Sequence, residues 1–283
     1  MHGNIKFKGN PLILVGRALK TGSPAPDFTV ISQDLKEVKL KDFSGKIKVV
    51  TSFPSLDTPV CDLQIKEFNE KASGVSKDVV ILGISKDLPF AQKRFCQANK
   101  IKNAVVVSDY RFSSFGINYG FLIRELNLLA RTVVIIDKND IVRYIQVVEE
   151  LSAPPDYGEV LKALEEVIKN PAVTYREELP GKCKPCEAGT PPLPKEKIEK
   201  LLAQYRGWQL VEDKKLVKEL KFKDFIEAKY FLDLVSVIAE EQGHHPTFTL
   251  IYNKLKITLT THAAGGLTEN DFIMAKIIDE LGG

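Results

Sequence analysis

The sequence predicts two unlike folds in one chain, an α/β unit followed by an α+β unit. Strand and helix patterns alternate over residues 1–170, which is typical of a sheet with helices on its faces. After a proline-rich stretch the order becomes helix, two strands, helix, two strands, helix, which indicates a four-stranded antiparallel sheet covered by helices. A length of 283 residues allows two domains. We therefore expect domains at 1–170 and 195–283, joined by a linker or docking segment at 171–194.

In the first half, short apolar runs predict the strands and helical spacing of apolar residues predicts the helices. The expected strands are Val49 to Phe53, Val79 to Ile84, Val105 to Val107, Thr132 to Asp137 and, after a turn at 137–140, Ile141 to Val147. The expected helices are Asp62 to Ala72, Leu88 to Ala98 and Tyr157 to Lys169.

The second half shows the same signals in a different order. The expected helices are Pro194 to Tyr205, Lys223 to Gln242 and a last helix that begins at Thr268. The expected strands are two within Trp208 to Phe222, then Thr247 to Tyr252 and Leu255 to Thr261.

The composition excludes several classes of protein. A content of 44% hydrophobic and 27% charged residues is that of a globular protein and argues against a disordered chain. A net charge of +3 is too small to indicate nucleic-acid binding, and the apolar runs are too short to cross a membrane. The sequence shows no secretory signal and has only four cysteines, so we expect a cytoplasmic protein whose thiols are reduced at rest.

Cys61 stands where a predicted strand gives way to a predicted helix. Asp57 or Thr58 could cap this helix, and Pro59 suits its first turn. Unpaired N–H groups and the helix dipole favour a thiolate in this first turn, and the thiolate is the nucleophilic form of cysteine. A small apolar side chain at a helix start would explain the residue equally well from geometry alone.

The surrounding motifs add specificity to this position. The pattern Pro54-x-x-x-Thr58-x-x-Cys61 resembles the active-site motif of the peroxiredoxins. Residues 55–61, residues 87–96 and Leu129-Ala-Arg131 together resemble the thiol peroxidase subfamily, and this resemblance covers about residues 1–169. It implies a thioredoxin-like fold for the first domain.

The resemblance also implies roles for five residues. Cys61 would attack the peroxide and become a sulfenic acid, with Thr58 as a hydrogen-bond donor and Pro54 as a shield from water. Arg131 would hold the thiolate and stabilise the charge that develops on the breaking O–O bond. Cys96 would then form a disulfide with Cys61, and a thioredoxin-like protein would reduce it. Because a disulfide needs Cα atoms within about 7 Å, two cysteines on different helices imply local unwinding on oxidation.

Three of the four histidines cluster in the second half. His244 and His245 lie between a helix and a strand, and His262 ends the next strand, so the three imidazoles are expected at one end of the sheet. Imidazole suits proton transfer at neutral pH, and three imidazoles could also bind zinc. A polar helix end is the structural alternative for the adjacent pair.

The spacing of these histidines is similar to that of another family. Glu240-x3-His244-His245-Pro246, followed by Tyr252, His262 and Asp271, resembles the pterin-4a-carbinolamine dehydratase signature over about residues 180–283. The family removes water from a 4a-hydroxytetrahydropterin and needs no metal. The resemblance implies that His244 and His245 act as acid and base, that His262 lines the pterin site and that Glu240 orients the histidines.

Three questions stay open at this point. Asp271 follows Thr268 by three residues, so it also fits a helix-capping box. Cys183 and Cys186 form a Cys-x-x-Cys that could be half a zinc site, a built-in reductant or an ordinary segment of the dehydratase family. The second domain could also be a non-catalytic dimerisation or partner-binding module. The favoured prediction is a bifunctional fusion without a bound cofactor, which uses a thioredoxin-like reductant and a pterin substrate and assembles as a homodimer or a larger homo-oligomer.

Overall fold

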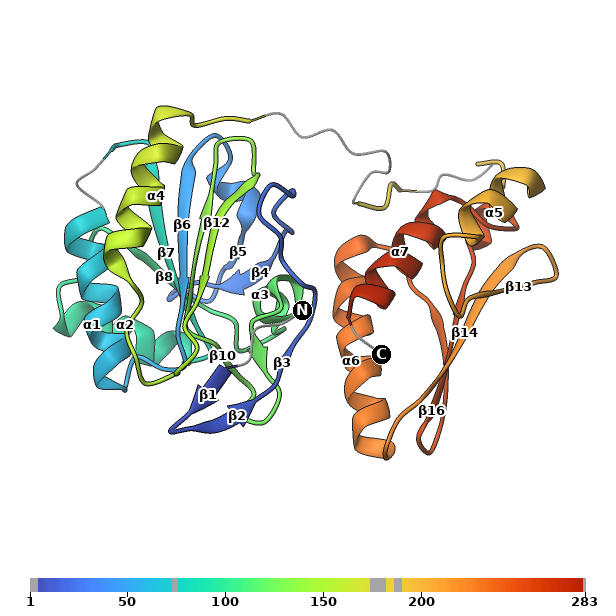
Figure 1. Cartoon of the computed structure of the whole chain (residues 1–283), viewed down its shortest axis with the longest axis horizontal. Coiled ribbons are helices and arrows are strands. Elements are labelled where there is room, and N and C mark those ends of the chain that lie inside the picture. The colour runs from blue at the N-terminus through green and yellow to red at the C-terminus, as the bar shows by residue number, and fades with distance from the viewer. Residues whose placement is uncertain (1–4, 73–75, 174–181, 186–189, 282–283) are drawn as a thin grey trace. The chain divides into compact units, whose positions relative to one another are not determined.

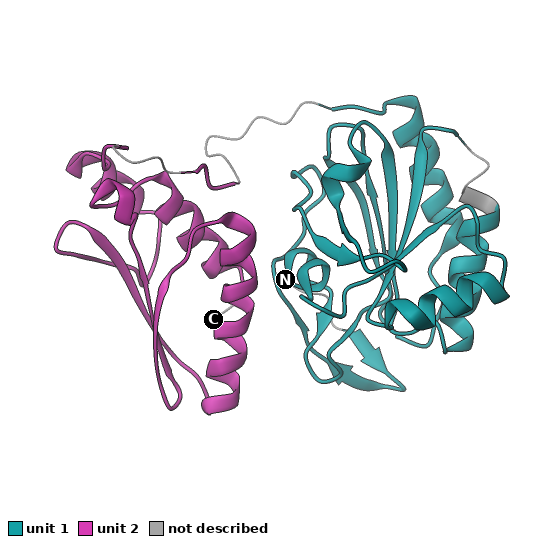
Figure 2. Cartoon of the chain, turned by 180° about the vertical axis from the view of Figure 1, so that it is seen from behind, with its two compact units in different colours: residues 1–176 teal, residues 177–283 magenta. Residues whose placement is uncertain are grey.

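A computed structural model describes residues 5–72, 76–173, 182–185 and 190–281 (Figure 1). The chain divides into two compact units, Met1–Arg176 and Glu177–Gly283 (Figure 2). Among the described residues, none of the helices combines the length and the apolar character needed to cross a membrane.

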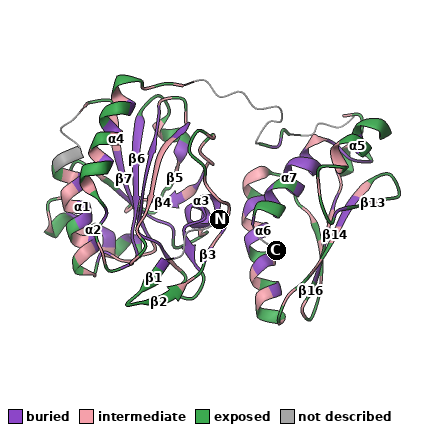
Figure 3. Cartoon of the chain, in the orientation of Figure 1, coloured by how far each residue is buried: buried purple, intermediate pink, exposed green. Residues whose placement is uncertain are grey.

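A seven-stranded sheet forms the centre of the first unit, in the order β12-β11-β6-β7-β8-β4-β5. Its strands are β4 (Thr29–Ile31), β5 (Glu37–Lys39), β6 (Ile47–Ser52), β7 (Val79–Ser85), β8 (Val105–Ser108), β11 (Thr132–Ile136) and β12 (Val142–Val147). The strands β6, β7 and β8 are parallel, and the other pairings are antiparallel. All residues of β6 are buried (Figure 3), and so are all residues of β11, as expected for strands covered on both faces.

Helices cover this sheet. They are α1 (Pro59–Glu67), α2 (Pro89–Ala98), α3 (Ser114–Tyr119) and α4 (Tyr157–Lys169), and a 3₁₀ turn spans Leu40–Phe43. The helix predicted for residues 62–72 is different in detail, because α1 begins at Pro59 and a π-helical turn, Phe68–Ala72, replaces its last part. Val160, Leu164 and Val167 of α4 pack in one core cluster with Val49 and Ile81 of the sheet.

Two small sheets complete the first unit. One is the hairpin of β1 (Ile5–Phe7) and β2 (Asn10–Leu12). The other joins β3 (Leu14–Val15), β9 (Leu122–Ile123) and β10 (Leu128–Leu129). The sequence patterns predicted neither of them.

The second unit has the predicted four-stranded antiparallel sheet, and its strands lie in the order β13-β14-β16-β15. The strands are β13 (Gln209–Val211), β14 (Lys215–Lys221), β15 (Thr247–Ile251) and β16 (Lys254–Leu259). The helices are α5 (Lys195–Leu202), α6 (Phe225–Gln242) and α7 (Glu269–Glu280), with a 3₁₀ turn at His262–Ala264. Leu255, Ile257 and Leu259 of β16 are buried and alternate with more exposed residues, so one face of this sheet packs on the helices.

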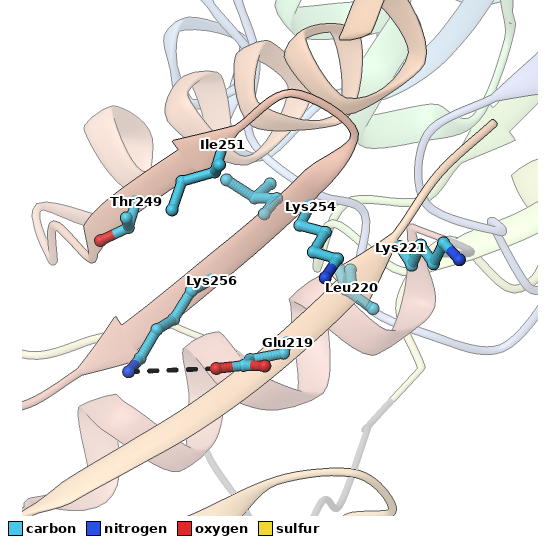
Figure 4. Close-up of a pocket in the computed structure, with 8 residues that line it drawn as sticks. Glu219, Leu220, Lys221, Thr249, Ile251, Lys254 and Lys256 are labelled. Atoms are coloured by element: carbon cyan, nitrogen blue, oxygen red, sulfur yellow. Dashed lines mark ion pairs between the residues drawn. The ribbon is translucent and has the colours of Figure 1, made fainter. Parts of the chain in front are cut away.

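The open face of the same sheet carries a shallow cavity of about 380 Å³ (Figure 4). Lys221, Lys254 and Lys256 line it together with Glu219, whose carboxylate lies 4.0 Å from the Lys256 ammonium group. None of the residues that the sequence predicted as functional lies in its lining.

Candidate functional sites

Cys61 lies fully buried in the first turn of α1, after β6 and a loop through the buried Pro54. Thr58 occupies the N-cap position, but its side chain does not cap the helix. The N–H groups of Cys61 and Asp62 instead bond to the Thr58 carbonyl oxygen, at 3.1 and 3.0 Å. The Thr58 Oγ1 lies 2.7 Å from Cys61 Sγ and 3.2 Å from the Ser55 carbonyl oxygen, so the sulfur is the nearer of its two partners.

Arg131 brings a fixed positive charge to the same sulfur. It precedes β11, is 2% exposed, and its Nη2 lies 3.3 Å from Cys61 Sγ. Its Nε and Nη2 also donate to the Leu151 carbonyl oxygen, at 3.1 and 3.0 Å. The structure thus brings together Cys61, Thr58 and Arg131, three residues that the sequence selected, around one sulfur atom.

Gln64 belongs to this site, although the sequence analysis did not select it. It lies one turn after Cys61 on α1, is fully buried, and accepts a hydrogen bond from Arg131 Nη1 at 2.5 Å. Its Nε2 donates to the Thr51 hydroxyl and to the Ser52 carbonyl of β6. The available signal was a polar residue on the same helix face as the cysteine.

Asp87 holds the loop that leads to Cys61. Its carboxylate accepts hydrogen bonds from the Ser55 hydroxyl and the Leu56 N–H, each at 2.7 Å, and from the Ser85 hydroxyl at 2.8 Å. Asp87 immediately precedes Leu88, the N-cap of α2. One side chain therefore ties the approach to α1 to the start of the helix that carries the second cysteine.

Cys96 lies on α2 and is 7% exposed. It shares a core cluster with Cys61, on a different helix as predicted, and both thiols are free in this structure. Burial raises the pKa of the Cys96 thiol, and a hydrogen bond from Gln33 Nε2, at 3.2 Å, opposes that rise. The neutral thiol is therefore the form that the folded state favours for Cys96.

In the second unit, His244 and Asp271 form a buried pair. His244 follows Gly243, which ends α6 with φ of 63°, and its Nε2 lies 2.8 Å from Asp271 Oδ1. The other oxygen, Asp271 Oδ2, accepts from the Thr261 hydroxyl and the Thr268 N–H. Asp271 is thus a capping-box residue of α7 and a histidine partner at once.

The other two histidines lie nearer to solvent. The His245 side chain is 62% exposed, and its Nε2 lies 3.0 Å from Glu240 Oε2. His262 is exposed in the 3₁₀ turn that follows β16. Glu240 therefore contacts His245, whereas the carboxylate that contacts His244 is Asp271. Among the residues that the structure describes, no group of three or more His, Cys, Asp or Glu side chains could hold a metal ion.

Cys183 is a docked, buried residue, 7% exposed. Its N–H donates to Gln242 Oε1 at the end of α6, and the next residue, Lys184, exchanges two hydrogen bonds with the Asn270 side chain of α7. Cys186 lies outside the described residues. The described part of this segment is therefore bonded to the second unit.

A thioredoxin-like fold with a buried cysteine at a helix start, held by a hydroxyl and a guanidinium group, defines a class of cysteine-based redox proteins. Comparison with known proteins agrees: residues 20–161 match the redoxin family model, and residues 191–281 match the model for pterin 4 alpha carbinolamine dehydratase. The chain belongs to the redoxin family, and its second unit is of the pterin 4 alpha carbinolamine dehydratase family. Both family predictions are confirmed.

Two thiol peroxidases and one solved structure are similar to the first unit over almost their whole length. The thiol peroxidase of Oceanobacillus iheyensis is 47% identical over 161 residues, which are 57% of this chain and 98% of the relative. The thiol peroxidase of Bacillus subtilis is 45% identical over 165 residues, or 58% of this chain and 98% of the relative. The crystal structure of a peroxiredoxin-like protein from Aquifex aeolicus superposes with a TM-score of 0.55 and 41% identity, over 58% of this chain and 96% of that one.

Proposed function

We propose that the first unit reduces hydrogen peroxide and organic hydroperoxides at Cys61. The observation that carries the proposal is that a hydroxyl donor and a buried guanidinium group both contact the same sulfur, at 2.7 and 3.3 Å. Such contacts favour a negative charge on the sulfur and stay in place for the charge that develops in the transition state. The buried Pro54 keeps water from the sulfur.

The reaction begins when the Cys61 thiolate attacks the terminal peroxide oxygen. The O–O bond breaks, the sulfur is oxidised to a sulfenic acid, and the alkoxide or hydroxide that leaves takes up a proton to become an alcohol or water. Thr58 donates to the reacting atoms. Arg131 stabilises the negative charge on the departing oxygen.

Cys96 completes the cycle in this proposal. Its thiol attacks the Cys61 sulfenic acid, forms the Cys61–Cys96 disulfide and releases water, and a dithiol protein of the thioredoxin type reduces the disulfide back to two thiols. The redoxin family model and the thiol peroxidase relatives support this cycle. The dependence on a thiol reductant suits a cytoplasmic setting, which we propose with it.

The test is peroxide-dependent oxidation of thioredoxin by the wild type, Cys61→Ser and Cys96→Ser. We expect no turnover with Cys61→Ser. We expect Cys96→Ser to consume one peroxide and then stop as a sulfenic acid that a dimedone-type reagent captures. Turnover by Cys61→Ser at the wild-type rate would overturn the assignment.

For the second unit we propose dehydration of 4a-hydroxytetrahydropterin to quinonoid dihydropterin. The buried His244–Asp271 pair supports this activity, because a carboxylate on one ring nitrogen fixes the orientation of the imidazole, a group suited to proton transfer. One histidine protonates the leaving 4a-hydroxyl group, which departs as water, and the other takes the N5 proton. We assign these two roles to His244 and His245, with His262 at the pterin and Glu240 as the partner of His245.

The competing proposal is that this unit only mediates dimerisation or binds a partner. Carbinolamine dehydration by the wild type, His244→Ala and His245→Ala separates the two. Loss of the rate in the histidine variants supports catalysis, and equal rates in all three proteins would leave the binding role. Both families are known for self-association, so we also propose a homodimer or larger homo-oligomer, which sedimentation of the intact chain would test.

A further inference from the structure

The N-terminal hairpin of β1 and β2 packs against residues 149–152, the segment that carries the carbonyl group holding Arg131. The Lys6 N–H donates to the Glu149 carbonyl at 2.6 Å, and the Leu151 N–H donates to the Lys6 carbonyl at 2.8 Å. Residues 149–151 therefore run beside β1 like an added strand, with a parallel bridge between Lys6 and Glu150.

The Glu150 side chain closes this arrangement. The hairpin turn places Lys8 and Gly9 in the left-handed region, with φ of 50° and 79°, so that both N–H groups point the same way. They donate to the Glu150 carboxylate at 3.0 and 3.3 Å. The Ser152 hydroxyl donates to the same carboxylate at 2.6 Å. The Glu150 carboxylate thus joins the hairpin turn to Ser152, the residue that follows Leu151.

Leu151 connects this cluster to the reacting sulfur. Its carbonyl oxygen accepts from Arg131 Nε and Nη2, and the same Nη2 lies 3.3 Å from Cys61 Sγ. We propose that Glu150 is a positioning residue for peroxide reduction: it fixes the hairpin and Leu151, and Leu151 holds the Arg131 guanidinium against Cys61. This inference rests on the proposed peroxidase function of Cys61.

The Glu150 carboxylate stays ionised, and so keeps its hydrogen bonds to the hairpin turn and Ser152, over the pH range of the experiments. The Ser152 hydroxyl and the N–H groups of Lys8 and Gly9 lower the pKa of the Glu150 carboxyl to about 2. Because the pKa is lowered, the Glu150 carboxylate is fully ionised above the ordinary glutamate range, and the stabilisation from its hydrogen bonds is lost only as the pH falls towards 2. Between pH 5 and 9 the positioning effect is therefore independent of the titration of Glu150 itself.

The test compares Glu150→Gln with Glu149→Gln in the full chain. Glu149 is the exposed neighbour, so its variant makes the same charge change without altering the hydrogen bonds of the Glu150 carboxylate. Rapid mixing with hydrogen peroxide gives the rate constant for Cys61 oxidation, and alkylation of Cys61 across pH reports how the thiolate is stabilised. We expect roughly a tenfold lower oxidation rate for Glu150→Gln, less than the ~10²-fold that a 1 Å misplacement can cost. We also expect its alkylation profile to move to higher pH.

Two further measurements keep the outcome clear. Glu150→Asp should recover part of the rate. Gly9→Val keeps the Glu150 side chain but opposes the left-handed turn that presents the Lys8 and Gly9 N–H groups to it, so it should also lower the rate. Reduced thermal stability with an unchanged oxidation rate and pH profile in Glu150→Gln would overturn the positioning role. An inactive wild type would instead overturn the proposed peroxidase function.

Discussion

Replacing Gln64 with leucine tests whether the buried network around Arg131, beyond the residues of the motif, controls the reactivity of Cys61. Gln64 is fully buried and links Arg131 Nη1 to Thr51 and Ser52 of β6. Leucine has a similar size but no polar atoms. The substitution therefore removes one support of the guanidinium group and keeps its bonds to Leu151.

The magnitude follows from the bond that is lost. A hydrogen bond to a charged group contributes about 1.5–3 kcal/mol, and a unit of this size loses about 2–4 °C in melting temperature for each kcal/mol. We therefore expect Gln64→Leu to melt roughly 3–12 °C lower. Because two hydrogen bonds to Leu151 still hold Arg131, we expect the oxidation of Cys61 to slow only about tenfold, which corresponds to ~1.4 kcal/mol.

The assay is rapid mixing of the reduced protein with hydrogen peroxide, followed by thermal unfolding of the same samples. Gln92→Leu is the matched control, because Gln92 is a fully buried glutamine on α2 that donates to Ser85 and Val107. It should lose comparable stability and keep the wild-type rate of the first oxidation step. Equal oxidation rates for the two leucine variants would refute the reasoning.

Three other predictions concern the same unit. Thr58→Val should slow Cys61 oxidation by roughly 10- to 100-fold, since it removes a hydrogen bond to a charged sulfur, and Thr58→Ser should recover most of the rate in the same rapid-mixing experiment. Because burial raises the pKa of Cys96, disulfide formation after the first step should speed up as the pH rises above neutral, and a flat pH profile would contradict the assignment. Gln33→Leu removes the hydrogen-bond donor that lowers this pKa, so it should slow disulfide formation at each pH. Hydrogen exchange at the starts of α1 and α2 should be faster in the oxidised protein than in the reduced one, and equal exchange would argue against local unwinding.

Helices and strands with strong apolar periodicity were readable from the sequence. The helix α4 has the predicted limits, Tyr157 and Lys169, because its apolar face packs on the sheet along its whole length. Five of the seven strands of the large sheet, β6, β7, β8, β11 and β12, were also found, because apolar runs mark them, whereas the three-residue strands β4 and β5 were not predicted. The predicted helix 194–205 is shorter in the structure, where α5 spans Lys195–Leu202.

The elements that were missed are short and depend on distant residues. The two-residue strand β3 pairs with β9, where Leu14 lies opposite Ile123, and the six-residue helix α3 follows Ser113, whose φ is 52°. Such segments carry too few residues for a periodic signal, so contacts with distant parts of the chain decide their conformation.

In the candidate peroxidase site, too, the sequence identified some residues and missed others. Cys61, Thr58 and Arg131 are side chains in a motif, so the sequence selected them. Leu151 acts through its backbone carbonyl, a group that every residue has, so the sequence could not identify it. Glu150 reads as an ordinary surface glutamate until the fold brings the hairpin turn to its carboxylate.

Asp271 shows why sequence spacing alone could not choose between two roles. A capping box and a place in the histidine site were alternatives, because the sequence spacing fits both roles. In the structure the two carboxylate oxygens have different hydrogen-bond partners. Oδ2 accepts from the Thr268 N–H and the Thr261 hydroxyl, and Oδ1 lies next to His244 Nε2. The cap fixes the carboxylate rigidly at the start of α7, and a rigid carboxylate is what an imidazole needs to keep one orientation. Asp271 can therefore position His244 because it also caps α7.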